Sequence, residues 1–374
     1  MTPEAGFEMT SNQPTGVDAS FLGKGEVQIN NEKGKTMPAP GGDFGELMAM
    51  ARGFQAAKML MVAVDLAVFD FLEEPRSAVE AAAWLKADDR AVGIFLNGLA
   101  ALGLVQKEVD YFRNSERASR LLVRGKDDYR GEIIKHMEHT WERGWNDLQH
   151  TVLGGHPRDA DPEKWLDAKQ ERDEREVRAF ICGMDAIARD LAPRVTAVLN
   201  LKNVRRLLDL GGGPATYAIT FAKANPQLQA TVFDLPQPVK IAQEQIAKHG
   251  LGGRVDTLAG NFLKDDIGQD YDFIWVSQIL HSHDEGQCKG IITKCVQALN
   301  PGGTLAIHDF YLNKDGASPI GPAIFSVHML AVTPRGRSYT WGEVAEWMAA
   351  TGLSQPEHVR YGEEESSILL AQKK

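Results

Sequence analysis

The chain is poor in cysteine, in positive charge and in long apolar runs. Its 374 residues include three cysteines, Cys182, Cys288 and Cys295. They are too few and too scattered for a disulfide framework, which favours a reducing compartment such as the cytoplasm. The 41 Lys and Arg are outnumbered by 51 Asp and Glu, for a net charge of −10. A general nucleic-acid binder needs a basic face to displace counterions, so this charge argues against one.

The scarcity of long apolar runs argues against a membrane-spanning segment. The most apolar stretch, MLMVAVDLAVFDF at 59–71, is too short to span a bilayer and carries Asp65 and Asp70. We interpret it as a buried core or interface helix. The N-terminus shows no basic region followed by an apolar run, which is the pattern of a secretory signal. We therefore expect a cytoplasmic protein without a membrane partner.

Composition divides the first 200 residues into three parts. Residues 1–43 are rich in Gly, Pro, Asn and Thr without periodicity, which predicts a disordered arm. Residues 44–125 have the pattern of helices followed by a hairpin, as in a winged helix. The helix that would enter a DNA groove, at 90–102, carries one cation, Arg90, so we expect it to pack and not to bind phosphates. Residues 126–200 are helical again, and we expect them to form a linker that contributes to a substrate pocket.

Residues 201–374 alternate short apolar runs with helical stretches. The strand-like runs are RRLLDL, QATVFDL, RVDTLAG, YDFIWVSQ and GTLAIHDF. This alternation predicts an α/β fold with a doubly wound, mostly parallel sheet. Ligands bind such a sheet where its strands end, at the carboxyl edge.

The first of these strands runs into a glycine loop, LLDLGGGPATYA at 207–218. Glycines between a strand and a helix let the backbone approach a ligand closely and leave amide N–H groups free. Asp234 ends the next strand, about twenty residues on, where an acid can accept both hydroxyls of a ribose. A loop that only made a tight turn would not require this acid. The pattern therefore predicts a cofactor that contains a nucleoside.

Two classes of cofactor fit such a loop. A dinucleotide fingerprint, G-x-G-x-x-G, needs a glycine where this chain has Thr216. Asp209, two residues before Gly211, would repel a diphosphate but suits a cation. S-adenosylmethionine has no phosphate and carries an ammonium and a sulfonium group. Asp209, Gly211, Gly213 and Asp234 together therefore favour S-adenosylmethionine.

At this point a family resemblance emerges. The segments LLDLGGGPATYA, FDLP, LAGNF, ILHSHDEGQC and CVQALNPGGTLAIHD resemble the small-molecule O-methyltransferases, which include plant caffeate and flavonoid methyltransferases and bacterial polyketide and acetylserotonin-type methyltransferases. The resemblance covers about residues 45–372. It implies a class I, Rossmann-like catalytic domain at 201–374 that binds S-adenosyl-L-methionine. It also implies a winged-helix dimerisation domain at 44–125 and a homodimer whose N-terminal helices swap and reach the partner's pocket.

The resemblance implies a set of cofactor contacts. These are Asp209, Gly211, Gly213, Asp234, Leu235, Gly260, Asn261, Phe262 and Ser277. The chain departs from the family at four positions. Ala215 replaces the third glycine of the loop, and Ser277 replaces a lysine four residues before the catalytic histidine. Asn261 replaces the acid of a G-D-x-F stretch and can still hydrogen-bond an adenine amine, while His283 replaces the tryptophan of the plant H-D-W motif.

The stretch VSQILHSHDEGQC, at 276–288, holds the proposed base. His281 directly follows the fourth strand, which lies beside the first in a doubly wound order. A histidine, with a reference pKa of about 6.5, can take the proton of a phenol, whose pKa is about 10, as the oxygen attacks the methyl group. The resemblance assigns His281 as this base. A carboxylate fixes the tautomer of such a base, and two residues at matching family positions, Asp309 and Glu343, are expected near it.

The resemblance also points to a pocket for a small hydroxylated aromatic substrate. Met184 matches a family methionine that clamps an aromatic ring, and thioethers adapt to ring faces. His328 and Met329 are expected on a helix beside the pocket, with Trp145 on its far side. His283 either lines the pocket or is a solvated loop residue.

Other functions remain open from the sequence alone. A relative on the same fold could methylate carbon, or keep the cofactor without transferring its methyl group. A metal-dependent hydrolase could use His281 and His283, but no set of ligands here has a zinc spacing, and we predict no metal. A DNA-binding regulator would need a basic recognition face, which residues 88–102 lack.

Overall fold

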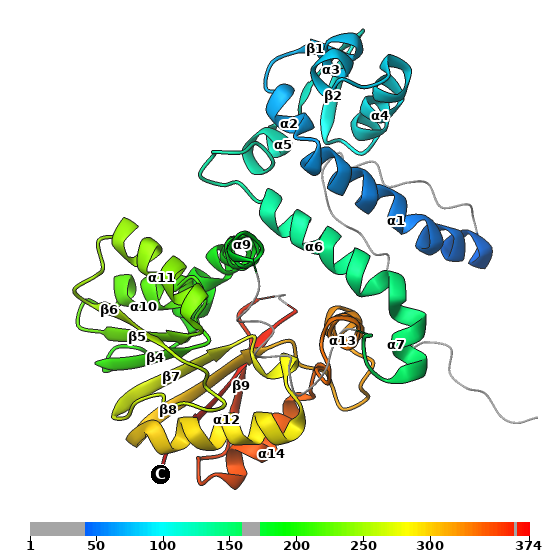
Figure 1. The fold of residues 1–374 in the computed structure, drawn as a ribbon. Coiled ribbons are helices and arrows are strands. Elements are labelled where there is room, and N and C mark those ends of the chain that lie inside the picture. The colour runs from blue at the N-terminus through cyan, green and yellow to red at the C-terminus, as the bar shows by residue number, and fades with distance from the viewer. Residues whose placement is uncertain (1–41, 159–172, 363–364) are drawn as a thin grey trace, which may run out of the picture.

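The computed structural model describes residues 42–158, 173–362 and 365–374 (Figure 1). The predicted disordered arm at 1–43 lies outside these residues, except for its last two. Asp43 already belongs to the first helix, α1 (Asp43–Asp65), so helical structure begins inside the segment that we assigned to the arm.

The N-terminal domain surrounds a three-stranded antiparallel sheet of order β1-β3-β2. A capping box of Ser77 and Glu80 begins one helix, and Asp88 caps the next. Apolar side chains from helices and strands form one core. The elements, in chain order, are α1, α2 (Val68–Phe71), β1 (Arg76–Ser77), α3 (Ala78–Leu85), α4 (Asp89–Ala101), β2 (Val105–Glu108), β3 (Tyr111–Asn114) and α5 (Glu116–Leu121).

Helix α1 differs from our expectation for the apolar stretch at 59–71. That stretch is not one helix, because α1 ends at Asp65, Ala67 adopts a left-handed φ of 55°, and α2 begins at Val68. In the other direction α1 extends to Asp43. Its 23 residues are long and apolar enough to cross a membrane, so the argument from a short stretch fails for the whole helix. The buried core helix of a soluble protein meets the same criterion, although only 17% of the apolar window of α1 is buried within this chain.

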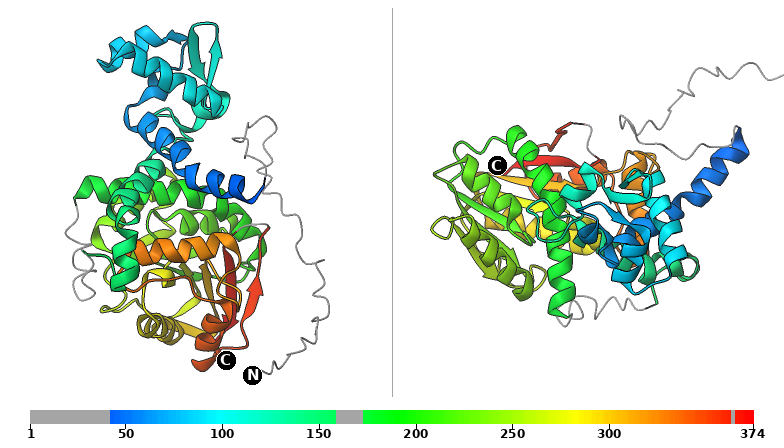
Figure 2. Two further views of the ribbon diagram at one scale, coloured as in Figure 1. Left: turned by 90° about the vertical axis from the view of Figure 1, so that its right-hand side faces the viewer. Right: turned by 90° about the horizontal axis from the view of Figure 1, so that it is seen from above.

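Further helical segments connect this domain to the second one. They are α6 (Gly131–Arg143), η2 (Trp145–Asp147), α7 (Leu148–Gly154) and α9 (Glu174–Val198). Helices α6 and α9 approach closely at Gly183, where a Cβ would lie 3.3 Å from Ile133 Cα. Figure 2 shows the N-terminal domain standing off from the sheet and joined to it through these helices.

The second domain contains a seven-stranded sheet of order β6-β5-β4-β7-β8-β10-β9. The first five strands of this order are parallel, and the hairpin at the C-terminus adds two antiparallel strands. The fold is therefore the predicted doubly wound α/β type, with the fourth strand beside the first. The strands are β4 (Arg206–Leu210), β5 (Gln229–Asp234), β6 (Val255–Ala259), β7 (Tyr271–Ser277), β8 (Leu299–Asp309), β9 (Glu357–Val359) and β10 (Ser367–Gln372).

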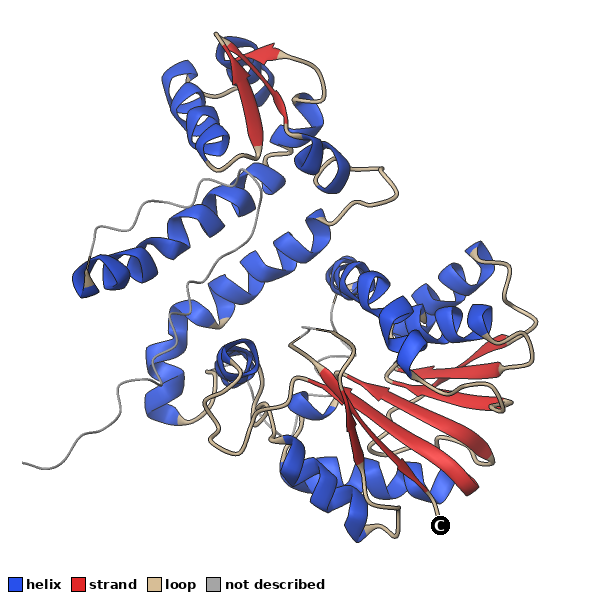
Figure 3. Cartoon of the chain, turned by 180° about the vertical axis from the view of Figure 1, so that it is seen from behind, coloured by secondary structure: helices blue, strands red, loops and turns tan. Residues whose placement is uncertain are grey.

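Helices cover both faces of this sheet (Figure 3). One core lies between the sheet and α9, α10 (Thr216–Ala224) and α11 (Pro236–Lys248), and the other between the sheet and α12 (Glu285–Ala298) and α14 (Trp341–Ala350). The chain leaves β4 toward β5 and β6, then returns to β7 on the other side of β4. Loops after neighbouring strands therefore diverge at this point and leave a crevice for ligands. Helix α13 (Ile320–Val332) packs on η2, α7 and η3 (Leu280–Ser282) beyond this edge.

Candidate active site

The glycine loop after β4 is tightly packed. Gly211 and Gly213 adopt φ values of 71° and 51°, a region that favours glycine. A Cβ at Gly211 would lie 2.3 Å from Ile279 Cδ1. Ala215, at the position of the third family glycine, adopts a φ of 68° and accepts the strain that a side chain brings there.

Asp234 ties this loop to the end of β5. Its Oδ2 accepts a hydrogen bond from the Gly213 amide at 2.8 Å, and its Oδ1 accepts one from the Leu235 amide at 2.7 Å. The Gly211 amide donates to the Phe233 carbonyl at 2.7 Å. The fold thus brings four predicted cofactor residues, Gly211, Gly213, Asp234 and Leu235, to one edge of the sheet.

Asp209 places a buried carboxyl group under the loop. A Cβ at Gly212 would lie 2.7 Å from its Cγ, and its Oδ2 accepts a hydrogen bond from the Ala218 amide at 3.2 Å. Burial raises the pKa of Asp209 to about 7, against the effect of that hydrogen bond and with a further contribution from the charge of Asp234. A cation at this loop would favour the ionised form of Asp209. The two acids therefore fit a ligand with a ribose and a positive charge.

Asn261 offers a second test of whether a nucleoside fits. Its Oδ1 accepts a hydrogen bond from the Leu263 amide at 3.0 Å. Its Nδ2 is buried and has no hydrogen-bond partner among the residues that the structure describes. A buried donor without a partner is costly. The predicted hydrogen bond from Asn261 to adenine stays a prediction, and the group without a partner is a donor, which suits a ring nitrogen of adenine.

Gly260 and Phe262 flank Asn261. A Cβ at Gly260 would lie 2.6 Å from the Phe233 ring, so only glycine fits without a shift. The Phe262 ring meets the edge of His283, with ring centroids 5.5 Å apart. The residues present at this edge thus fit S-adenosylmethionine in hydrogen bonding, charge and close approach of the backbone.

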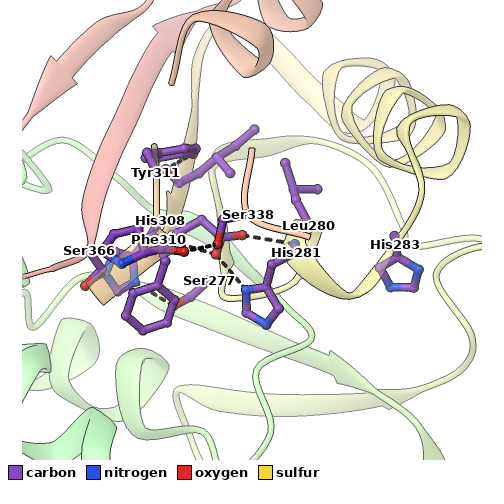
Figure 4. Close-up of polar contacts among 12 residues, drawn as sticks. Ser277, Leu280, His281, His283, His308, Phe310, Tyr311, Ser338 and Ser366 are labelled. Carbon is purple, nitrogen blue, oxygen red and sulfur yellow. Dashed lines mark hydrogen bonds and ion pairs between the residues drawn. The ribbon is translucent and has the colours of Figure 1, made fainter. Parts of the chain in front are cut away.

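His281 and Asp309 form a buried pair at the ends of β7 and β8. The Nδ1 of His281 lies 2.6 Å from Asp309 Oδ1, and the backbone amide of His281 donates to Asp309 Oδ2 at 3.3 Å (Figure 4). The Phe310 amide also donates to this carboxylate, at 2.9 Å. His281 is 8% exposed and Asp309 is 4% exposed, so water does not separate them.

The protonation of this pair follows from its contacts. Burial by itself would raise the pKa of Asp309, but the charge of His281 and the hydrogen bonds outweigh it, so this pKa lies below its ordinary value. Asp309 is therefore a carboxylate that accepts the Nδ1–H of His281. A neutral His281 then carries its lone pair on Nε2, as a general base requires.

Two further contacts hold His281 in place. Phe325, on α13, lies edge-on to the imidazole with ring centroids 4.8 Å apart. Gly336 packs against its backbone, because a Cβ there would lie 2.3 Å from the His281 carbonyl oxygen. We did not predict Phe310, Phe325 or Gly336 as site residues. The sequence offered only two signals for them. Phe310 is an aromatic residue directly after Asp309, and Phe325 is one three residues before His328.

Glu343, which we expected near His281, makes no hydrogen bond with it in the described part of the chain. Its Oε2 completes the capping box of α14 with Thr340, whose amide and hydroxyl donate at 2.8 Å. Its Oε1 accepts a hydrogen bond from Arg337 at 2.7 Å. The capping box is a local motif that an N3 glutamate satisfies without reaching the site. Its partner Arg337 directly follows Gly336, which packs against the His281 backbone.

Ser277 and His283 have hydrogen-bond partners outside the His281–Asp309 pair. The Ser277 hydroxyl lies 2.8 Å from Nδ1 of His308, and Nε2 of His308 lies 2.7 Å from the Tyr361 hydroxyl. Burial lowers the pKa of His308 to about 4, so it is neutral. In Figure 4 His283 lies apart from the cluster around His281, and its Nδ1 is 3.2 Å from Gln287 Oε1. Within the described residues there is no group of three His, Cys, Asp or Glu that could hold a metal.

The predicted substrate residues lie on elements that face this edge. Trp145, on η2, donates its indole N–H to Nδ1 of His328 at 3.0 Å. Met329 is buried on α13 next to His328. Met184 is half-buried on α9, directly after Gly183, where α9 meets α6. Trp145 and His328 are thus in contact with each other, whereas Met184 lies on a different helix, α9.

The carboxyl edge of the sheet suits a cationic nucleoside and holds a base beside it. A class I, S-adenosylmethionine-dependent methyltransferase requires these two features. The sheet order agrees with that class. The comparisons with known proteins agree as well, because the profile of the O-methyltransferase domain matches residues 145–354 and that of the O-methyltransferase dimerisation domain matches residues 48–124. The chain belongs to this O-methyltransferase family, and S-adenosyl-L-methionine is its cofactor.

Known relatives are similar in sequence to this protein over most of its length. The 3-hydroxy-5-methyl-1-naphthoate 3-O-methyltransferase of Streptomyces sahachiroi is 31% identical over 84% of this chain and 91% of its own length. The tetracenomycin polyketide synthesis 8-O-methyl transferase TcmO of Streptomyces glaucescens is 28% identical over 83% of this chain and 91% of its own length. The crystal structure of human N-acetylserotonin methyltransferase with SAM shares the fold, with a TM-score of 0.80 at 24% identity over 90% of this chain and 99% of that one. The family decides against the hydrolase and the regulator among our alternatives.

Proposed function

We propose that this O-methyltransferase acts on a hydroxyl of a small aromatic molecule, with His281 as the general base. The observation that carries the proposal is the buried His281–Asp309 pair at the edge that also bears the glycine loop. The Streptomyces sahachiroi relative is named for a hydroxylated naphthoate, which supports an aromatic substrate.

The chemistry divides between the cofactor and the chain. S-adenosylmethionine, when bound, supplies a methyl group on a positively charged sulfur. The carboxylate of Asp309 holds the Nδ1–H of His281 and stabilises the imidazolium that forms. Nε2 of His281 takes the proton from the substrate hydroxyl, which leaves that oxygen with an electron pair for the new bond. His281 later returns this proton to water.

We further propose which residues hold the cofactor. The two acids, Asp209 and Asp234, suit its ammonium group and its ribose, and the Asn261 amide suits a ring nitrogen of its adenine. The remaining predicted contacts are proposed from their place at the same edge, with the Ser277 hydroxyl shared with His308. They are Gly211, Gly213, Leu235, Gly260, Phe262 and Ser277.

The substrate side of the site is proposed to include residues from three helical elements. Trp145, His328 and Met329 approach from η2 and α13, and Met184 approaches from α9. His283 is kept as a candidate pocket residue, and its ring is buried against Phe262.

We propose a cytoplasmic homodimer, without a membrane or nucleic acid as partner. The match to a dimerisation domain at 48–124 supports the dimer. So does the exposed apolar stripe on α1, because Phe44 and Met50 are 73% and 79% exposed in the single chain and a second chain would cover them. We keep residues 44–125 as the dimerisation domain, 126–200 as the linker and pocket segment, and 201–374 as the catalytic domain.

Substitution of the base tests the proposal. His281→Ala should abolish methyl transfer to a hydroxynaphthoate, while calorimetry should show nearly unchanged affinity for S-adenosylhomocysteine. A turnover rate equal to that of the wild type would refute the role of His281. Absence of any affinity for S-adenosylmethionine or S-adenosylhomocysteine in the wild type would refute the cofactor site.

A further inference from the structure

His328 is, with Ser326, one of two polar residues on helix α13. The structure fixes which of its nitrogens carries a proton. The indole N–H of Trp145 points at its Nδ1 at 3.0 Å, and the two rings are nearly parallel, at 21°. An indole nitrogen can only donate a hydrogen bond. Nδ1 of His328 is therefore the acceptor and has no proton.

His328 is also neutral at neutral pH. Its burial holds its pKa below the ordinary value, and the charge of His281 lowers this pKa further. A neutral imidazole without a proton on Nδ1 carries it on Nε2. This Nε2–H makes no hydrogen bond with any residue that the structure describes, and it is not sealed off from solvent. The Nε2–H of His328 is therefore available to donate a hydrogen bond to a ligand.

The free donor lies close to the reacting centre. Phe325, three residues before His328 on α13, contacts both imidazoles. Its ring centroid is 4.8 Å from that of His281 and 5.8 Å from that of His328. The base and the donor thus contact the same aromatic ring and lie in the same part of the site.

We propose that His328 is a specificity-determining residue whose Nε2–H donates to an oxygen acceptor on the aromatic substrate, a ketone or a carboxylate, at a ring position away from the methylated hydroxyl. This inference rests on the proposed function, because it assumes that the aromatic substrate lies beside His281. Trp145 is the positioning residue. By occupying Nδ1 it prevents His328 from accepting a hydrogen bond, so a group that can only donate, such as an ammonium, finds no partner there.

Equilibrium dialysis of the S-adenosylhomocysteine-saturated, full-length protein tests this directly. The probes are 1-naphthoate, 1-acetylnaphthalene and 1-methylnaphthalene, which lack a hydroxyl and so bind without reacting. The wild type should bind the ketone about fivefold and the carboxylate more than about tenfold more tightly than the methyl compound, as one hydrogen bond predicts. Preference for one acceptor alone supports the proposal and narrows the substrate class.

Variants separate hydrogen bonding from shape. His328→Leu should reduce both ratios to about one, while His328→Gln, which keeps an N–H at the end of its side chain, should retain part of them. Trp145→Phe should lower the ratios without abolishing them, because the proton of His328 can then move to Nδ1. Val327→Ala, on the exposed side of α13, is the matched control and should leave both ratios unchanged.

Three results would overturn the proposal. The first is a wild type that binds the ketone and the carboxylate no more tightly than the methyl compound. The second is His328→Leu with the same affinity ratios as the wild type. The third is an equal loss of affinity for all three probes in His328→Leu, which would make His328 a packing residue only. The proposed function fails separately. If the wild type transfers no methyl group to any hydroxynaphthoate, the dialysis ratios still report on His328, because they require no turnover.

Discussion

Replacement of Asp209 by asparagine should make the stability of the ligand-free protein less dependent on pH. Burial raises the pKa of this carboxyl from 3.8 to about 7. Between these values the folded state binds more protons than the unfolded state. The free energy of unfolding therefore falls as pH rises from about 4 to about 7, and it levels off above that.

The size of this effect follows from the shift. A shift of about three pKa units corresponds to about 4 kcal/mol at most, at about 1.4 kcal/mol for each unit. Part of this free energy is already lost at pH 5, where an unfolded aspartate is ionised. Between pH 5 and pH 8 the wild type should thus lose about 2–3 kcal/mol relative to Asp209→Asn.

Urea unfolding at a fixed protein concentration, followed by far-UV circular dichroism at pH 5, 6, 7 and 8, measures this difference. Asp270→Asn is the matched control, because the Asp270 side chain is 74% exposed and its removal should not change the pH dependence. Saturating S-adenosylmethionine should reduce the loss in the wild type, since a nearby cation favours the carboxylate. Parallel pH profiles of the wild type and Asp209→Asn would refute the reasoning.

Three further substitutions test other parts of the site. Asp309→Asn should lower kcat about 10²–10³-fold, because the base loses the group that fixes its tautomer. Its affinity for S-adenosylhomocysteine, measured by calorimetry, should stay within about twofold of that of the wild type. An unchanged kcat would contradict this. Asn261→Leu should weaken that affinity about tenfold through loss of the buried donor, and an equal affinity would show that adenine does not use it. Glu343→Gln should lower the free energy of unfolding by about 1 kcal/mol in urea titrations yet leave kcat within about twofold, whereas a large fall in kcat would restore Glu343 to the catalytic machinery.

Local patterns were sufficient for the parallel sheet and for the edge that carries the predicted cofactor residues, but not for the bounds of α1 and α2. The alternation of apolar runs predicted the parallel sheet, and chain order alone put Asp209, Asp234 and His281 at the ends of adjacent strands. The strand ends of a doubly wound sheet share one edge, so a residue's place after a strand already gives its place in the site.

Side-chain partners were harder to predict than positions. Both Asp309 and Glu343 stood at family positions for an acid near the base, and the structure gives the contact to Asp309 alone. Glu343 is taken by a helix cap and by Arg337, six residues earlier. For Asn261 the sequence predicted a hydrogen bond to adenine, and the structure adds that its oxygen accepts from Leu263 while its Nδ2 has no partner among the described residues.

The sequence by itself determined the fold class, the cofactor and the strand ends that carry the site, because these depend on periodicity and on the order of elements along the chain. Tertiary structure alone decided the pairs that set the chemistry. Asp309 reaches His281 across 28 residues, and Trp145 reaches His328 across 183. Such contacts depend on how separate helices and strands pack in three dimensions, and no local rule of the chain contains that information.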